Sequence, residues 1–205
     1  LLELYRKVDA MPQIKKSFIG SGVRYDMLLH KTGDSACDAK TAEYTEELIK
    51  KHVSGRLKVA PEHTNDSVLR LMRKPLFSQF HQFKRIFDRI NSRENLKQQI
   101  IPYFISSHPG STVESMAELA AETRQLNFHL EQVQDFTPTP MTMATEMYYT
   151  GINPETGEKV YVARSMKDKE AQRKFFFWYK PEERKQIAQL LRRMGRNDLI
   201  KKLGI

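Results

Sequence analysis

The stretch that decides the fold is IIPYFISSHPGST, residues 100–112. Its first part, residues 100–105, is almost entirely apolar and rich in β-branched and aromatic side chains, which favours a buried strand. Turn-forming residues follow, and Ser111 with Glu114 has the spacing of a capping box that opens a helix through Leu126. The stretch therefore predicts a strand, a polar loop and a helix in succession, which is the repeating unit of a parallel α/β sheet.

Three other apolar stretches lead into polar turns and helical patterns in the same way. They begin at Ser17 (SFIG), Leu57 (LKVA) and Leu130 (LEQVQDF). With Ile100 included, the four starts are 40, 43 and 30 residues apart, and a (β/α)₈ barrel uses about 31 residues for each strand and helix. We therefore predict an α/β fold that is a partial parallel (β/α) barrel, with right-handed crossovers.

Two of the four strands depart from the ideal pattern. Pro102 has no amide proton, which argues for an edge strand or a bulge. Residues 130–136 contain too many polar side chains for a strand that is buried on both faces. The fourth stretch is therefore predicted to be either an edge strand or a strand whose polar residues face a polar cavity.

The pattern of helices divides the chain at residue 150. We expect residues 1–150 to form the barrel portion and residues 151–205 to form a basic, mainly helical extension with a short strand at 159–163. The first residues, 1–11, read as an amphipathic helix without an initiator methionine, which suggests a piece of something longer. Helices are predicted at residues 1–11, 41–53, 76–90, 111–126, 166–179, 181–194 and 197–203.

The composition excludes several classes of protein. The mean hydropathy is −0.60, and no apolar run approaches the roughly 20 residues that cross a membrane. One cysteine, Cys37, cannot form an internal disulfide or supply the thiolates of a zinc site or an iron–sulfur cluster. His63, His108 and His129 lack metal-site spacing. We expect a cytoplasmic protein without a structural metal.

The excess of positive charge lies near the C-terminus. Residues 164–205 hold 13 Lys and Arg residues against 5 Asp and Glu residues, whereas the whole chain holds 34 against 25. Such asymmetry is typical of a surface for RNA or another anionic partner. A solvated helical face that is rich in Lys and Arg explains it equally well.

Polar residues follow each predicted strand, where the sites of parallel βα folds gather. Arg24 could hold a carboxylate, Glu62 could accept from a ribose diol, and the backbone after Phe136 could contact an adenine edge. The expected cofactor-binding residues are Ser21, Arg24, Glu62, His63, Ser106, Ser107, Phe136 and Thr137. No catalytic residue is assigned.

A purely structural explanation of the same segments stays open. Ser111, Thr64 and Asn65 stand where helix caps belong. Gly22 and Gly110 could serve turn geometry alone.

Three ordered segments resemble motifs of the radical S-adenosylmethionine superfamily. Residues 68–74 (VLRLMRK) resemble its Val-Leu-x-x-Met-x-Arg pattern, and residues 108–112 (HPGST) resemble the Phe-Pro-Gly-Glu-Thr turn of methylthiotransferase-like members. Residues 136–142 (FTPTPMT) are similar to their Tyr-Ser-Pro-Arg-Pro-Gly-Thr segment. The closer resemblance is to the YgiQ-like branch, through segments such as LKVAPEHTND at 57–66 and FFFWYKPE at 175–182.

This resemblance implies that the four predicted strands are the third to sixth of a radical-SAM (β/α)₆ barrel. The cofactors of the intact protein would be S-adenosylmethionine and a 4Fe-4S cluster, and the reaction would form a deoxyadenosyl radical that abstracts hydrogen from an unknown substrate. The cluster-binding Cys-x-x-x-Cys-x-x-Cys loop is not in these 205 residues, so we expect this piece to lack the cluster and to be inactive alone. Open sheet edges could pair in a dimer.

Two other functions compete with this interpretation. A nucleic-acid-binding module could use the basic tail and stack bases on the aromatic run at 175–179, although such a run is more often a buried hinge. A phosphate-binding metabolic barrel is weaker, because no glycine-rich phosphate loop follows any strand.

Overall fold

The computed structural model describes the backbone of all 205 residues and every side chain except that of Gln132. The chain divides into two compact units. The first unit comprises Leu1–Ala60 and Ser78–Pro102, and the second comprises Pro61–Phe77 and Tyr103–Ile205. The division predicted at residue 150 rests on sequence pattern and stays a prediction. Among the described residues, no helix has the length and apolarity to cross a membrane.

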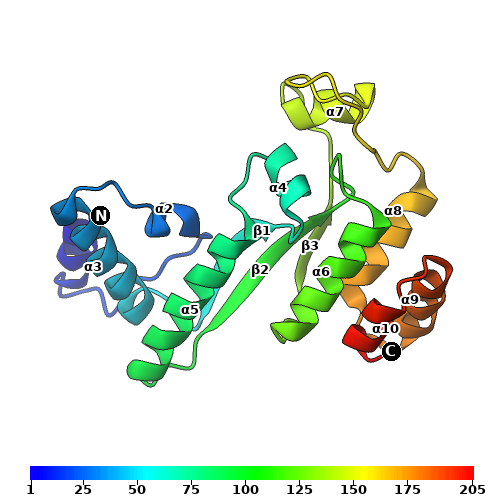
Figure 1. Ribbon diagram of the computed structural model, residues 1–205. Coiled ribbons are helices and arrows are strands. Elements are labelled where there is room, and N and C mark those ends of the chain that lie inside the picture. The colour runs from blue at the N-terminus through cyan, green and yellow to red at the C-terminus, as the bar shows by residue number, and fades with distance from the viewer. The chain divides into compact units, whose positions relative to one another are not determined.

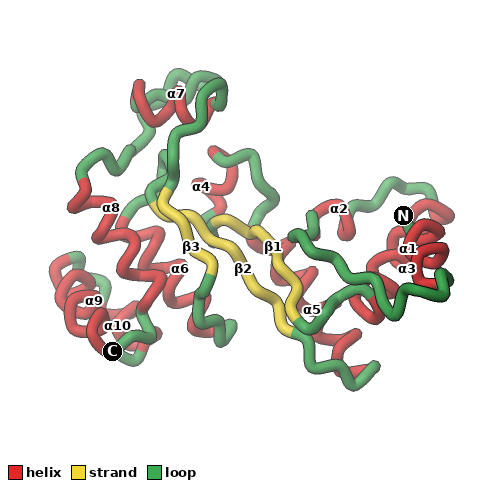
Figure 2. The backbone as a smooth tube through the Cα atoms, turned by 180° about the vertical axis from the view of Figure 1, so that it is seen from behind, coloured by secondary structure: helices red, strands yellow, loops and turns green.

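The sheet has three strands in the order β1-β2-β3. They are β1 (Arg56–Glu62), β2 (Gln99–Ser106) and β3 (Gln132–Asp135). β2 and β3 pair in parallel, with Tyr103 opposite Gln132 and Ser106 opposite Asp135, and they run side by side in both views (Figures 1 and 2). The fold is therefore mixed α/β with a small parallel sheet, and the sheet is not closed into a barrel.

Two predicted strands do not form. Residues 17–20 lie outside any strand, and a single parallel bridge nearby joins Val23 to Val59. Gly20 and Gly22 interrupt the segment and Phe18 is half exposed, so a continuous buried ladder has too few apolar residues to stabilise it. The strand expected at 159–163 is likewise reduced to one bridge, between Ile152 and Lys159.

An edge position was suggested for two strands, and the structure confirms it for only one of them. β3 stands at the end of the strand order, so the edge-strand alternative for this polar stretch is confirmed. The edge position that Pro102 suggested is wrong, because β2 is the central strand. Pro102 precedes the segment of β2 that pairs with β3, which begins at Tyr103, so its missing amide proton interrupts none of that pairing.

The first unit is built from helices around an aromatic core. Its helices are α1 (Leu2–Asp9), α2 (Tyr25–Leu29), α3 (Ser35–Lys51) and α5 (Phe77–Arg93). The ring of Tyr25 lies 5.9 Å from that of Phe80 and 5.8 Å from that of Phe83. The two Phe side chains are fully buried, which confirms the apolar stripe predicted for this helix.

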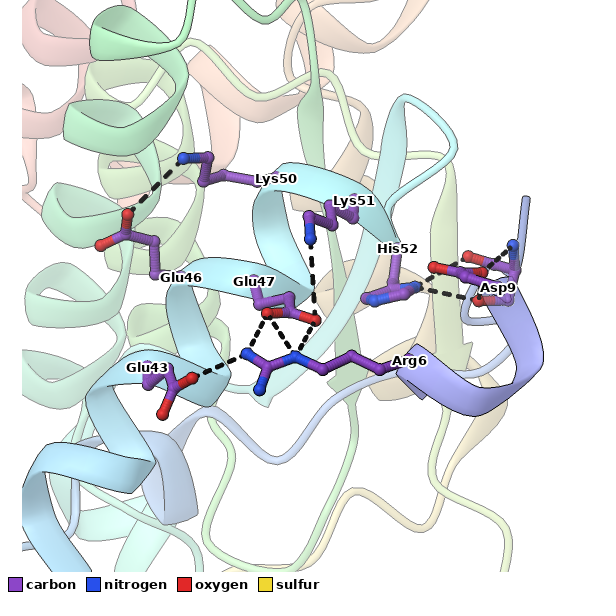
Figure 3. Close-up of polar contacts among 9 residues, drawn as sticks. Arg6, Asp9, Glu43, Glu46, Glu47, Lys50, Lys51 and His52 are labelled. Atoms are coloured by element: carbon purple, nitrogen blue, oxygen red, sulfur yellow. Dashed lines mark hydrogen bonds and ion pairs between the residues drawn. The ribbon is translucent and has the colours of Figure 1, made fainter. Parts of the chain in front are cut away.

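Helix α1 contacts α3 through ion pairs and stacked rings. Arg6 pairs with Glu43 at 2.7 Å and with Glu47 at 2.5 Å, as Figure 3 shows. Tyr5 stacks on the ring of His52 with 4.4 Å between ring centroids. None of the residues of α1 is fully buried, and exposed ion pairs contribute little to stability, so this helix is held more weakly than the core helices.

The second unit packs six α-helices and a 3₁₀ helix. They are α4 (Asp66–Leu71), α6 (Val113–Gln125), α7 (Met143–Thr150), α8 (Met166–Arg173), η1 (Lys174–Phe177), α9 (Pro181–Arg193) and α10 (Asn197–Leu203). The central helix α6 contacts α8, η1 and α10. Phe104, Met116 and Leu119 are fully buried, so the core lies between the sheet and α6.

The aromatic run at 175–179 belongs to this core. Phe175 and Phe176 have no exposed surface, and the indole Nε1 of Trp178 donates to Thr123 Oγ1 at 3.2 Å. The hypothesis that these rings stack on bases is therefore wrong for Phe175, Phe176 and Trp178. The alternative of a buried aromatic segment is confirmed.

The start of α6 differs by one residue from the predicted capping box. Thr112 is the cap, and its side chain and that of Ser115 bond reciprocally to each other's backbone N–H, in place of Ser111 and Glu114. Ser111 therefore has its hydroxyl free to point into the interior. At α4 the prediction holds for Asn65, which accepts from two backbone N–H groups, whereas the cap is not Thr64.

Candidate functional site

At the carboxyl end of β1 and at that of β2, one residue has a strained backbone conformation. Glu62 closes β1 with φ 68°, and Ser107 follows β2 with φ 60°. Residues other than glycine adopt this left-handed region at a cost of about 1 to 3 kcal/mol, and such residues cluster at functional sites. Both side chains are buried, so the two neighbouring strands end in polar residues that point away from bulk water.

Each of these residues keeps one polar atom unpaired. Glu62 Oε1 accepts from Lys74 Nζ at 3.0 Å, while Glu62 Oε2 and Ser107 Oγ are buried and have no hydrogen-bond partner among the described residues. Buried polar atoms in proteins are nearly always hydrogen-bonded, so an unpaired one needs an explanation. A bound polar ligand would supply one.

His63, directly after β1, is fixed in one tautomer. Its Nδ1 accepts from the backbone N–H of Thr64 and of Asn65, both at 3.0 Å, so the proton of the neutral ring is on Nε2. This nitrogen lies 3.3 Å from Ser111 Oγ and donates to it. Because burial disfavours the charged imidazolium, and nearby His108 adds to the effect, the pKa of His63 is lowered to about 3.

Gln172 on α8 connects the polar loop after β2 to the C-terminal part of the chain. Its Oε1 accepts from Ser107 N and from Ser111 Oγ, both at 2.9 Å, and its Nε2 donates to Ser111 O at 2.7 Å. The side chain has no exposed surface. We call Ser107, Ser111, His63 and Gln172 the buried amide network, and it holds the strained residue Ser107 in place.

His108 is the second buried histidine of the site. Its Nδ1 donates to the carbonyl of Pro109 at 2.8 Å, which leaves Nε2 as the ring's acceptor, and its ring meets the edge of Phe136 at 5.0 Å. Burial lowers the pKa of His108 to about 4. Both histidines near the strand ends are therefore neutral at pH 7.

A hydrogen bond and an ion pair fix the side chain of Asp135 at the end of β3. Ser106 Oγ donates to Asp135 Oδ1, and Arg173 NH1 pairs with Asp135 Oδ2 at 2.9 Å. Phe136 comes next, half-buried between His108 and the ring of Tyr148, 5.8 Å away. The strand ends thus bring two carboxylates, two hydroxyls and an aromatic ring to the same end of the sheet.

The second unit contains six of the eight predicted site residues. Glu62, His63, Ser106 and Ser107 are buried, Phe136 is half-buried, and Thr137 is exposed, with its hydroxyl 3.4 Å from the carbonyl of Asp135.

Ser21 and Arg24 lie in the first unit, and the side chain of Arg24 is 68% exposed and pairs with Asp26 at 2.6 Å.

Sequence reasoning missed Gln172, Lys74 and Asp135. Gln172 is more than 60 residues from its partners, so no local pattern marks it. Asp135 ends the unusually polar fourth stretch, and that polarity was the available signal. Among the described residues, no group of three or more His, Cys, Asp or Glu side chains could hold a metal ion.

Gly110 holds a left-handed turn in this loop. It has φ 88°, and a Cβ atom there would overlap Cδ1 at the flexible end of the Leu71 side chain. We expect Gly110→Ala to lower the free energy of unfolding by about 2 kcal/mol, mostly from left-handed strain, with a smaller part from displacing the end of the Leu71 side chain. Urea unfolding measures this, with Gly157→Ala as the control, because Gly157 also has positive φ but has open space around it. Equal losses in both variants would show that the contact with Leu71 contributes nothing.

Comparison with known proteins adds two findings. Residues 131–203 match a family model described as a domain of unknown function, DUF3362. The chain is 68% identical over 203 residues to a UPF0313 protein of Bacteroides thetaiotaomicron and 62% identical over 203 residues to a UPF0313 protein of Porphyromonas gingivalis. It covers 99% of its own length in both alignments, but only 33% and 32% of those relatives.

A more distant relative gives the same result. A UPF0313 protein of Clostridium perfringens is 44% identical over 199 residues, which cover 97% of this chain and 29% of the relative. The chain thus spans about a third of the length of the relatives that it matches. Over almost all of its residues it is similar to proteins named UPF0313, and its C-terminal part matches the DUF3362 model.

Proposed function

We propose that this chain is part of the barrel of a YgiQ-like radical-SAM enzyme, with the segment at Val23 in the position of the third strand and β1 to β3 as the fourth to sixth. The intact protein would cleave S-adenosylmethionine reductively and use the deoxyadenosyl radical to abstract hydrogen from its substrate. Two of the segments that resemble superfamily motifs, residues 108–112 and 136–142, directly follow β2 and β3. That is where ligands bind in parallel βα folds.

The observation that carries the proposal is the pair of unpaired buried atoms, Glu62 Oε2 and Ser107 Oγ. A carboxylate oxygen accepts from the hydroxyls of a ribose, and a serine hydroxyl can either donate or accept. An adenosyl ligand offers both kinds of group. The strained backbone at the same two residues is expected where side chains are held ready for a ligand.

The residues of this chain fit S-adenosylmethionine but not an iron–sulfur cluster. S-adenosylmethionine would supply the adenosyl group, with Glu62 and Ser107 as its polar contacts and Phe136 as an apolar one. The neutral rings of His63 and His108 add no positive charge beside a sulfonium. An iron–sulfur cluster does not fit this chain, because its one cysteine, Cys37, is exposed on α3.

The first test uses a full-length relative, because this chain spans only a third of one. The Bacteroides thetaiotaomicron UPF0313 protein, purified without oxygen, reconstituted with iron and sulfide and reduced with dithionite, is expected to convert S-adenosylmethionine to 5′-deoxyadenosine. The product is measured by liquid chromatography with mass spectrometry, and omission of dithionite is the control. A preparation with a spectroscopically intact, reduced cluster that forms no deoxyadenosine would contradict the proposed function.

The second test assigns the binding residues. In the 205-residue chain, Ser107→Ala and Glu62→Gln are each expected to weaken S-adenosylmethionine binding about tenfold, which corresponds to one lost hydrogen bond of about 1.4 kcal/mol. Isothermal titration calorimetry measures this. Glu114→Gln, which alters an exposed carboxylate paired with Arg196, is the matched control. Wild-type affinity in both site variants would remove these residues from the binding site.

A further inference from the structure

The exposed surface of α9 carries a stripe of cations that no described carboxylate neutralises. Lys185, Gln189, Arg192 and Arg193 are exposed, and their spacing of four, three and one places them on one face of the helix. The opposite face, with Ile187, Ala188 and Leu191, is buried in the second unit. We call these four exposed residues the α9 stripe.

The neighbouring cations divide into paired and unpaired groups. Arg196 is bound by Glu114, Glu118 and Asp198, and Arg173 is bound by Asp135. By contrast, no ion pair joins Lys185, Arg192, Arg193, Lys201 or Lys202 to any carboxylate among the described residues. Lys201 and Lys202 lie on α10, which contacts α9 and runs beside it (Figure 1).

We propose that the α9 stripe is a binding surface for the phosphate backbone of single-stranded RNA. Lys185 and Arg192 are seven residues apart, which is about 10 Å along the helix axis, and the amide of Gln189 stands between them on the same face. Amide and guanidinium side chains are typical donors to phosphate oxygens.

The structure argues against a lipid surface as the partner. A helix that lies on a membrane inserts exposed apolar side chains. In α9 and α10 the large apolar residues Ile187, Leu191, Leu199 and Leu203 are buried instead. Among the positions of these helices that are exposed, all but Pro181 are polar or charged.

The same burial fixes the mode of RNA recognition. Phe175, Phe176 and Trp178 are buried, so these rings cannot provide the base stacking that single-strand binders use. Binding through the α9 stripe would rest on phosphate contacts, which carry no sequence information and weaken steeply with salt. This inference does not depend on the proposed enzymatic function, and either can fail alone.

The test measures binding of fluorescein-labelled oligouridine to the 205-residue chain by anisotropy between 50 and 200 mM salt. Arg192→Glu/Arg193→Glu is expected to weaken binding at least about tenfold at 50 mM salt and to reduce the slope of log K against log salt by about 1.4, because each phosphate contact contributes about 0.7. The matched control is Arg85→Glu/Arg89→Glu, which changes the net charge equally at exposed positions of α5 and is expected to weaken binding less than threefold.

Several results would overturn the proposal. They are the absence of oligouridine binding at 50 mM salt, unchanged binding by the stripe variant, and equal weakening by the stripe and control variants, which would show an effect of net charge alone. Polyglutamate that competes as well as oligouridine, or vesicles with phosphatidylserine that bind in a stripe-dependent way, would assign the surface to another partner. Arg192→Gln/Arg193→Gln removes charge without adding repulsion, so we expect it to bind oligouridine more weakly than the wild-type chain and more tightly than Arg192→Glu/Arg193→Glu. Circular dichroism verifies the fold of each variant.

Discussion

At pH 4 we expect His63 and His108 together to lower the free energy of unfolding by roughly 6 kcal/mol relative to pH 7, with about 3 kcal/mol from each. Both side chains are buried, and burial holds the pKa of His63 at about 3 and that of His108 at about 4, against the ordinary value near 6.5. The folded state therefore stays neutral at these positions while the unfolded state takes up protons. This contribution of the two histidines is complete above pH 6.5 and is lost as the pH falls from there toward their folded pKa values.

Urea unfolding at several pH values measures this loss, since a domain of this size has a total stability of about 5 to 15 kcal/mol. The diagnostic variant is His108→Phe, which keeps an aromatic ring against Phe136 and removes one titrating group. It is expected to regain about 3 kcal/mol at pH 4 relative to wild type, after correction for any difference at pH 7. His30→Phe is the control, because His30 is exposed. If both variants had the same pH profile as the wild-type chain, buried histidine would not be the cause.

Helices and strands can be predicted from the sequence where the pattern of apolar residues lies within the element itself. The stripe at Phe80, Phe83 and Phe87 predicts a buried helix face, and these residues are buried. The strands that begin at Leu57 and Ile100 and the polar edge strand near 132 are predicted in the same way, because burial periodicity is a property of neighbouring residues. Residues 17–20 resembled them in composition, but two glycines and an exposed Phe18 leave only a single bridge nearby.

The site was predictable only in part, for a physical reason. Glu62 and Ser106 end strands, and His63 and Ser107 directly follow them, so strand prediction places all four together. Ser111 was assigned to a helix cap, and the cap is one residue later, at Thr112. That shift directs the hydroxyl of Ser111 to Gln172, whose role comes from tertiary packing alone and leaves no local signal in the chain.

Gln172 is expected to be the polar side chain whose loss costs most, because every hydrogen-bonding group that it satisfies is buried. In Gln172→Leu, three groups would lose their partner: Ser107 N, Ser111 Oγ and Ser111 O. Each unpaired buried group costs about 1 to 3 kcal/mol, and leucine recovers part of this through apolar packing, so we expect a loss of about 4 kcal/mol in the free energy of unfolding.

Urea unfolding at pH 7 measures the Gln172→Leu loss, with Gln125→Leu at an exposed position of α6 expected to change stability by less than about 0.5 kcal/mol. A second variant, Gln172→Glu, separates the two halves of the amide: a carboxylate retains the acceptor for Ser107 N and Ser111 Oγ but lacks the donor to Ser111 O. Because that carboxyl group would be fully buried, its charged form is disfavoured, and we expect the variant to gain stability relative to wild type as the pH falls from 7 to 5. A Gln172→Leu chain as stable as wild type would mean that water replaces the amide, and that the left-handed backbone of Ser107 does not depend on α8.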